Sequence, residues 1–187
     1  MTRQLVKDTA IRLFSERGYP VIGMRDLSEA VGILPGSLYA HIESKEALLL
    51  DIVSTGVENF TQALTPIVAA DLPASERLRL ALRTHMEVLA VNLDQTRVTF
   101  HQWHYLTGER HDQMVEVRQN YEDVFRTLLR EGSADGSLHP RAERKVATLT
   151  IIGVLGSATE WFTPTGSSSP EQLADAIGDL LVLGLAP

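Results

Sequence analysis

Apolar residues recur at helical spacing along most of the chain, and no stretch shows the sustained two-residue alternation of a strand. Near the N-terminus, Leu5, Ala10, Ile11 and Phe14 fall on one face of a helix that Gly18 would end. Residues three or four apart share one side of an α-helix, whereas a strand repeats every two residues. The pattern therefore predicts an all-α chain.

Nine helices follow from this periodicity and from the residues that start and stop helices. The second helix is short and closed by Gly32, the third is very short and begins near Pro35, and Ser44 is the expected N-cap of the fourth. Pro66 and residues 71–75 are expected to separate the fourth helix from the fifth. The later helices are predicted near residues 76–92, 95–106, 110–130, 141–162 and 170–184.

The composition fits a soluble protein of the cytoplasm. The chain has 187 residues, 44% of them apolar, and no Cys, which excludes disulfides and thiolate metal sites. The most apolar stretch, residues 146–158, is about 13 residues long and too short to span a bilayer. These features predict a cytoplasmic location and no membrane partner.

The net charge of −7 is unevenly distributed. Residues 1–25 carry a net +3, residues 1–48 are neutral, and the rest of the chain carries the whole −7. A basic leading edge on an acidic body suits a protein in which only the N-terminal part meets DNA, because phosphates attract Lys and Arg. On charge alone, a random scatter of solvated residues explains the pattern equally well.

The second and third predicted helices, joined by a turn at Gly32, form a candidate helix-turn-helix. In such a unit the second helix inserts its N-terminal residues into the major groove. Tyr39 and His41 offer hydrogen bonds to phosphates, and Ala40 can touch a thymine methyl. Lys45, at the start of the fourth helix, is expected to meet a phosphate. The candidate DNA-binding residues are Arg3, Arg25, Pro35, Gly36, Ser37, Tyr39, Ala40, His41 and Lys45.

Three alternatives remain open for this segment. The short helix is also compatible with a corner of a helical bundle, and Tyr39 with a core aromatic residue. Arg25 is equally well placed to pair with Asp26 or Glu29 on a solvated face.

Residues 3–53 resemble the DNA-binding head of TetR-type transcriptional repressors. The signature is Leu38-Tyr39-x-His41-Ile42-x-x-Lys45-x-x-Leu48-Leu49, with Phe14, Gly18 and Arg25-Asp26-Leu27 at matching distances upstream. The resemblance implies a TetR-like fold, with a three-helix DNA-binding head over residues 1–47 and an effector-binding and dimerisation body over residues 48–187. It further implies a homodimer that reads a palindromic double-stranded DNA operator and is released by a small effector.

Five positions depart from the family pattern, and one of them is Ala40, which cannot hydrogen-bond a base. Ile22 and Gly23 stand where Thr or Ser usually caps the second helix and touches phosphate. Gly can still act as an N-cap, but a hydroxyl contact to phosphate is lost. Leu34 and Pro35 replace a frequent Ser cap and a polar residue. The departures leave the predicted fold unchanged and make the operator sequence harder to infer.

Aromatic, Met and His residues of the body are candidates for a small apolar effector site. The set is Phe60, Leu64, His85, Met86, Leu89, Phe100, His101, Trp103, His104, Tyr121, Phe125 and Trp161. The alternative is an ordinary aromatic core. His85, His101 and His104 would also suit zinc, but no carboxylate or Cys joins them at convincing spacing, and we expect neither a metal nor a cofactor.

The C-terminal third resembles TetR-type regulators of fatty-acid and sterol catabolism. The features are the aromatic pair Trp161-Phe162, the loop Pro164-x-Gly166 and a last helix that begins with the capping box Ser169-Pro170-Glu171-Gln172. This resemblance implies acyl-CoA or related hydrophobic thioesters as effectors.

The eighth and ninth helices are candidates for a four-helix dimer interface, with intramolecular core as the alternative. The glycines at 153 and 156 would admit a close partner helix. The candidate interface residues are Ile151, Leu155, Leu180 and Leu183.

Together these features predict a one-component DNA-binding repressor and not an enzyme. Effector bound among the fourth to eighth helices would tilt the fourth helix and change the spacing of the two heads. The rivals are a helical enzyme using His101 or His104, which lacks a partner group, and an interaction module without DNA binding. An activator would carry the same head.

Overall fold

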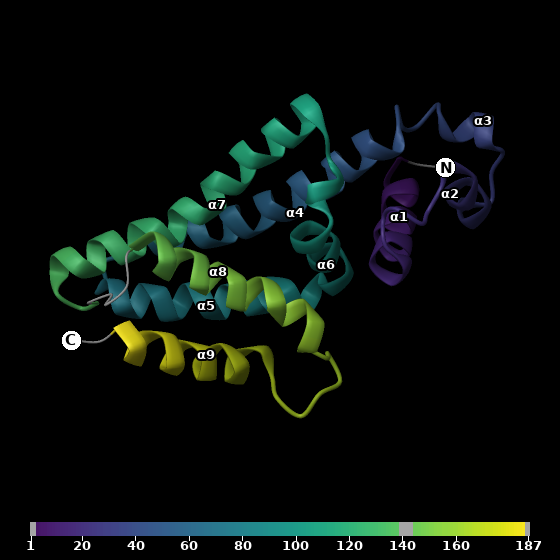
Figure 1. The fold of residues 1–187 in the computed structure, drawn as a ribbon. Helices are drawn as coiled ribbons and strands as arrows, with labels where there is room; N and C mark the ends of the chain where they lie inside the picture. Colours follow the sequence, from purple (N-terminus) through teal and green to yellow (C-terminus); the bar gives the residue numbers. More distant parts are fainter. Residues whose placement is uncertain (1–2, 139–143, 186–187) are drawn as a thin grey trace. The chain divides into compact units, whose positions relative to one another are not determined.

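A computed structural model describes residues 3–138 and 144–185, the last three by their backbone alone. Within these residues the chain is all-α, as predicted, with nine α-helices, one 3-10 helix and no strand (Figure 1). The elements are α1 (Arg3–Arg17), α2 (Met24–Val31), α3 (Pro35–Leu38), α4 (Lys45–Val68), α5 (Ala74–Val91), α6 (Leu93–His101), η1 (Trp103–Tyr105), α7 (Gly108–Asp135), α8 (Arg144–Trp161) and α9 (Pro170–Leu185).

Several helix ends are set by the local signals predicted from the sequence. Gly18 and Gly32 adopt positive φ angles of 86° and 79°, in the left-handed region that favours Gly at a helix end. The Ser44 hydroxyl accepts a hydrogen bond from the amide of Ala47 at 3.0 Å, which confirms its role as N-cap of α4. These contacts span only three or four residues, so the sequence alone reveals them.

The predicted capping box at α9 is also confirmed. The amide of Ser169 donates to Oε1 of Gln172 at 2.9 Å, and the amide of Gln172 donates to the Ser169 hydroxyl at 3.2 Å. At α2, Gly23 is the N-cap, and its amide donates to the carboxylate of Asp26 at 2.6 Å. The carboxylate at the third helical position thus supplies one half of a capping box, while the half that a Ser or Thr hydroxyl would supply is missing.

Three boundaries differ from the prediction. Pro66 lies inside α4 and not in the break after it. The helix ends two residues after Pro66, so the Pro disturbs few backbone hydrogen bonds. The neighbouring Thr65 hydroxyl donates to the carbonyl oxygen of Thr61 at 2.7 Å. The sixth helix ends early at His101, and α7 continues through Gly132 to Asp135. The predicted start of α8 at Arg141 lies outside the described residues.

The chain divides into two compact units. Unit 1 comprises residues 1–57 and 93–117, and unit 2 comprises residues 58–92 and 118–187. As a result, α4 and α7 each contribute residues to both units. The domain boundary expected after residue 47 stays a prediction.

Unit 1 contains α1–α3, the first part of α4, α6, η1 and the first part of α7. Its core includes Val6 of α1, fully buried, whereas Leu5, which was placed on the apolar face of the first helix, is 46% exposed. Gly56 of α4 packs against Thr99 of α6, and a Cβ atom at Gly56 would lie 2.0 Å from the Thr99 hydroxyl. Only Gly therefore fits at this crossing.

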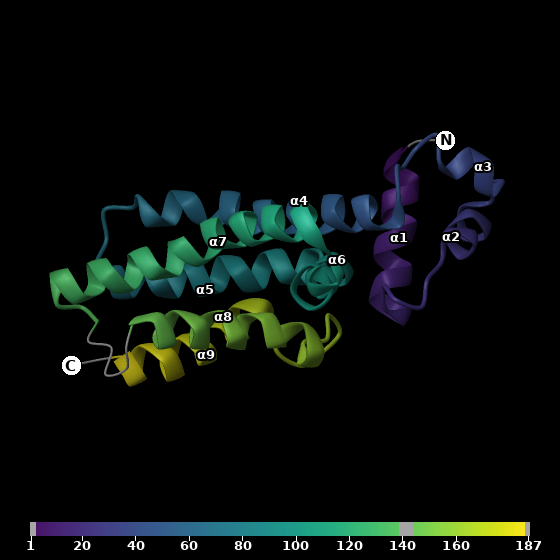
Figure 2. The same ribbon diagram turned by 45° about the horizontal axis from the view of Figure 1, so that its top comes forward.

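In unit 2, α9 runs alongside α5, and α8 also contacts α5 (Figures 1 and 2). Arg79 and Arg83 of α5 donate to Asp179 and Asp175 of α9, each with a shortest distance of 2.7 Å. No helix within the described part of the chain is long and apolar enough to cross a membrane.

Candidate DNA-binding surface and apolar effector site

The predicted helix-turn-helix is present in unit 1 as α2, a turn at Gly32 and α3. Leu27 of α2 and Leu38 of α3 are fully buried, and Ile42 is nearly so. These three side chains fix the short α3 against the rest of unit 1, because four residues of helix cannot hold themselves in place. The opposite side of α3 is left open to solvent.

The structure exposes most of the predicted base-facing residues. Pro35, Gly36 and Ser37 lie in α3 and are exposed. Tyr39 and Ala40 follow in the next turn and are also exposed, and the third helix is very short, as predicted. Because Tyr39 is 58% exposed, it is not a core residue. His41, in the same turn, is half-buried.

Arg25 lies on the exposed face of α2, 3.9 Å from Glu29. The side chains of both are more than 70% exposed, at 86% and 73%. This is the solvated pair that the sequence left open as an alternative. An exposed pair of this kind is worth little, so it does not prevent Arg25 from reaching a phosphate.

Lys45 takes a position that the sequence did not predict. Its Nζ donates to the carbonyl oxygens of Tyr19 at 3.0 Å and of Ile22 at 2.8 Å, and it lies 4.1 Å from the centroid of the Tyr19 ring. Desolvation lowers the pKa of Lys45, and the charge of Asp26 partly opposes this shift. The ammonium thus holds the loop before α2 against the start of α4.

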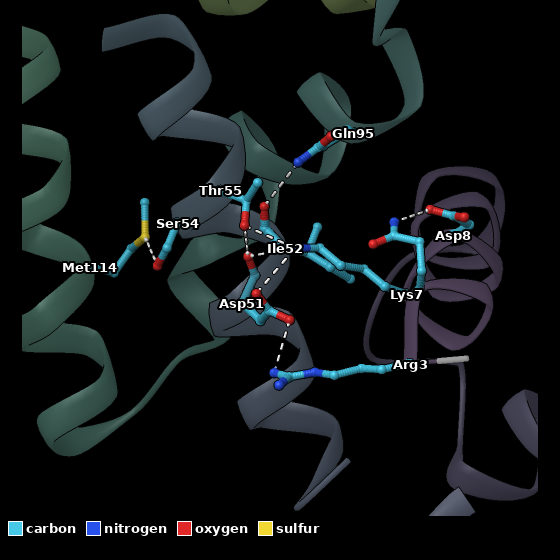
Figure 3. Close-up of polar contacts among 10 residues, drawn as sticks. Arg3, Lys7, Asp8, Asp51, Ile52, Ser54, Thr55, Gln95 and Met114 are labelled. Atoms are coloured by element: carbon cyan, nitrogen blue, oxygen red, sulfur yellow. Dashed lines mark hydrogen bonds and ion pairs between the residues drawn. The ribbon is translucent and has the colours of Figure 1, made fainter. Parts of the chain in front are cut away.

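Arg3 and Lys7 connect α1 to α4 (Figure 3). Arg3 lies 3.2 Å from the carboxylate of Asp51, and Nζ of Lys7 lies 3.1 Å from the same carboxylate and 2.8 Å from the hydroxyl of Thr55. Arg3, predicted to contact DNA, is therefore paired within the protein, although 69% of its side chain remains exposed.

Gln102 connects the end of α6 to the end of α1. Its Nε2 donates to the carbonyl oxygen of Phe14 at 2.7 Å, and its Oε1 accepts from the amide of Tyr19 at 2.7 Å. The Tyr19 ring stacks on Tyr105 with centroids 5.6 Å apart. Sequence reasoning missed Gln102, because a single Gln in an aromatic segment gives no signal of its partners.

Glu46 fastens α4 to the start of α7. Its Oε1 accepts hydrogen bonds from the amide and the hydroxyl of Thr107 at 2.8 and 2.9 Å, and these bonds lower its pKa. Arg110 lies 2.8 Å from Glu43 and 3.6 Å from Glu46. An open surface hollow of about 420 Å³ lies here, and its three carboxylates, one from Glu109, make it unsuitable for an anionic ligand.

Seven of the predicted effector residues form the interior of unit 2. The His85 ring stacks on Phe60 with centroids 4.4 Å apart, and Tyr121 packs edge-on against Phe60 and Phe125 at 6.1 and 5.4 Å. All seven have a relative exposure of at most 1%: Phe60, Leu64, His85, Met86, Leu89, Tyr121 and Phe125.

The polar part of this interior is the pair His85 and Tyr121. The Tyr121 hydroxyl lies 3.1 Å from Nδ1 of His85. Burial lowers the pKa of His85 to about 3, although a hydrogen bond to the backbone of Leu155 opposes the shift. Burial also raises the pKa of Tyr121. Both groups are therefore neutral near pH 7. The half-buried Arg118 acts on Tyr121 electrostatically, so the apolar interior contains one uncharged polar pair with a cation close to it.

The other predicted effector residues lie elsewhere. Phe100, His101, Trp103 and His104 belong to unit 1, where Trp103 stacks on His111 at 5.6 Å and His104 is exposed. Trp161 belongs to unit 2 and is 47% exposed. In the described residues, no group of three or more His, Cys, Asp or Glu side chains is arranged to hold a metal ion.

The predicted dimer residues divide between core and surface. Ile151 and Leu155 are at most 1% exposed and belong to the core of unit 2, which corrects their assignment to an interface surface. α8 is apolar on more than one side, so periodicity could not tell its two faces apart. Leu180 is 78% exposed, and Leu183 has no described side chain. The exposed apolar residues of α8 are Val146, Leu149 and Trp161.

Comparison with known proteins agrees with this architecture. The profile of the bacterial regulatory proteins of the tetR family matches residues 7–52, and that of the tetracyclin repressor-like C-terminal domain matches residues 71–185. The HTH-type transcriptional repressor KstR2 of Rhodococcus jostii is 28% identical over 182 residues, which cover 96% of this chain and 88% of that protein.

Solved structures share the fold. A bacterial regulatory protein in the tetR family from Rhodococcus RHA1 superimposes with a TM-score of 0.91 at 24% identity, over 98% of this chain and 96% of the other. AibR, solved in complex with isovaleryl coenzyme A and operator DNA, superimposes with a TM-score of 0.86 at 26% identity, over 96% and 97% of the two chains. This protein therefore belongs to the TetR family of helix-turn-helix transcriptional regulators, which are DNA-binding proteins and not enzymes.

Proposed function

We propose that this regulator is a cytoplasmic one-component repressor that binds a palindromic operator as a homodimer and leaves it when a hydrophobic acyl-CoA thioester binds. The observation that carries the DNA-binding part is the exposed side of α3 and the following turn, held in place by buried Leu38 and Ile42. The similarity to a named repressor along 96% of the chain favours repression over activation.

The interior of unit 2 supports a hydrophobic effector. An acyl chain would be accommodated among apolar rings, and a thioester carbonyl would find an uncharged hydroxyl in Tyr121. The solved relative with isovaleryl coenzyme A supports the same ligand class.

Release from DNA would follow from repacking of this interior. The rings of Phe60, His85 and Tyr121 are already in contact, so a ligand among them must move them apart. Phe60 belongs to α4 and Tyr121 to α7, and both helices continue into unit 1. A ligand that prefers the repacked state shifts the population toward it, with a typical coupling of about 1–3 kcal/mol.

The homodimer is proposed through α8 and α9. The exposed apolar residues Leu149, Trp161 and Leu180 lie on these helices of unit 2. Gly153 of α8 has open space in place of a side chain, which would admit a second helix at close range.

A thermal-shift series tests the effector part. Acyl-CoA thioesters of increasing chain length are compared with the matching free acids and with free CoA. A ligand at 100 times its dissociation constant stabilises the folded protein by about 2.7 kcal/mol. We expect stabilisation by thioesters alone, together with release of an operator fragment. Stabilisation without release would contradict the repressor mechanism, and no stabilisation by any compound would remove this ligand class.

A further inference from the structure

The α3 segment, which would enter the major groove, contains no side chain suited to bidentate reading of a base. Residues 33–42 read Ile-Leu-Pro-Gly-Ser-Leu-Tyr-Ala-His-Ile, without Arg, Lys, Asn, Gln, Asp or Glu. Direct readout of guanine normally uses Arg or Lys, and that of adenine uses Asn or Gln. Arg25 of α2 lies outside this segment. Any base specificity of residues 33–42 must therefore come from another type of contact.

Leu34 is the most exposed large apolar side chain of this segment. It is the N-cap of α3, its side chain makes no capping hydrogen bond, and it is 76% exposed. A polar residue at an N-cap typically stabilises a helix by about 1 kcal/mol relative to an apolar one. Leu34 thus forgoes a local stabilisation and leaves apolar surface in water, which is unfavourable unless something covers it.

The position of Leu34 indicates what covers it. The N-terminal residues of the second helix of a helix-turn-helix enter the major groove. The only apolar group that the bases present there is the C5-methyl of thymine. Gly36 has open space in place of a side chain, and Ala40 is exposed and small, so the backbone can approach the bases closely.

We propose that Leu34, together with Ala40, reads thymine methyl groups, so that each operator half-site is specified by thymines in the major groove. This inference rests on the proposed function, in which the α3 surface binds the operator. Ser37 and Tyr39 then supply hydroxyl contacts that position the protein without distinguishing the bases strongly.

The test begins with selection of a binding site from a random duplex pool by the full-length protein. Each thymine of the selected site is then replaced, one at a time, by 2′-deoxyuridine, which lacks the methyl group and keeps the base pair. We expect one or more replacements in each half-site to weaken binding about fourfold, the value of one buried carbon.

The variant Leu34→Ala assigns the contact. The affinities of this variant for the thymine and uracil sites should differ less than those of the wild type. Its thermal stability should be unchanged because the Leu34 side chain is exposed. Val21→Ala is the matched control, since Val21 is 72% exposed in the loop before α2 and should keep full discrimination.

The outcomes separate the inference from the function beneath it. If no site is selected from the pool, the proposed operator binding itself fails. If a site is selected but every uracil version binds equally well, operator binding stands and methyl readout is overturned. If uracil weakens binding equally in the wild type and in Leu34→Ala, Leu34 is not the reader.

Discussion

The side chain of Gln102 joins two helices of unit 1 by donating to the carbonyl oxygen of Phe14 at 2.7 Å. The same carboxamide accepts from the amide of Tyr19, so a single residue after α6 satisfies backbone groups on both sides of the end of α1. Gln102 is only 8% exposed. The orientation of α1 relative to α6 therefore depends on a polar group that water does not readily replace.

Replacement of this residue should be costly. Gln102→Leu leaves the Tyr19 amide without an acceptor and removes one donor to the carbonyl oxygen of Phe14. We expect the free energy of unfolding to fall by about 2 kcal/mol. Urea denaturation followed by circular dichroism measures the change. Gln119→Leu, at an exposed position of α7, is the control and should change stability little. Equal stability of the two variants would contradict the role of Gln102.

Lys45 should act on DNA binding through position and not through charge. Its ammonium is occupied by the carbonyls of Tyr19 and Ile22, so Lys45→Met should weaken operator binding while the salt dependence of binding stays unchanged. A phosphate contact, as the sequence suggested, would instead lower the slope of log affinity against log salt by about 0.9. Fluorescence anisotropy at several salt concentrations distinguishes the two, with Lys145→Met at an exposed position of α8 as the control.

Tyr39 should contact DNA through its hydroxyl. Tyr39→Phe should lower operator affinity about fivefold, the value of one hydrogen bond, at all sequences alike. Because Tyr39 is 58% exposed, the melting temperature of the Tyr39→Phe protein should match that of the wild type. Tyr105→Phe tests a hydroxyl on a residue stacked against Tyr19 and should retain full affinity. A Tyr39→Phe protein with wild-type affinity would remove this contact.

His85 should make stability depend on pH. Its pKa in the folded protein is about 3, below the ordinary value of 6.5, so the unfolded chain binds a proton in this range that the folded chain does not. Protonation of His85 in the unfolded chain therefore does not lower the free energy of unfolding above pH 6.5. As the pH falls from 6.5 toward 3, the free energy of unfolding drops by about 1.4 kcal/mol per pH unit.

Chemical denaturation at pH 7.0 and 5.0 measures this loss in the wild type and in His85→Gln, which keeps an acceptor for Tyr121. The wild type should lose more stability than the variant, by about 2 kcal/mol. His104→Gln, at an exposed position, should behave as the wild type. Parallel pH profiles for the wild type and His85→Gln would show that His85 is not buried in a neutral state.

Leu180 should contribute to the proposed dimer. Leu180→Glu places a charge on the exposed apolar surface of α9, and we expect the dimer dissociation constant to rise on the order of tenfold or more. Sedimentation velocity over a concentration series measures the change. Leu80→Glu, at a 38% exposed position of α5, should leave assembly intact. Unchanged assembly of the Leu180 variant would move the interface to another surface.

The sequence alone determined the helical class, the helix-turn-helix and the N-cap roles of Ser44 and Ser169. The helical class and the N-caps depend on contacts between residues three or four apart, and the helix-turn-helix was indicated by the order of its turn and cap residues within one short segment. The family signature around Leu38 and Tyr39 also depends on fixed spacing along one short segment.

Only the tertiary structure decided which faces are buried and which partners polar groups take. Ile151, Leu155 and Leu180 are equally apolar, yet packing within unit 2 buries the first two and exposes the third. Lys45 is fixed by carbonyls 23 and 26 residues earlier in the chain, and Gln102 by groups 83 and 88 residues away. Such contacts form only when distant helices pack together, and no periodicity within either helix specifies them.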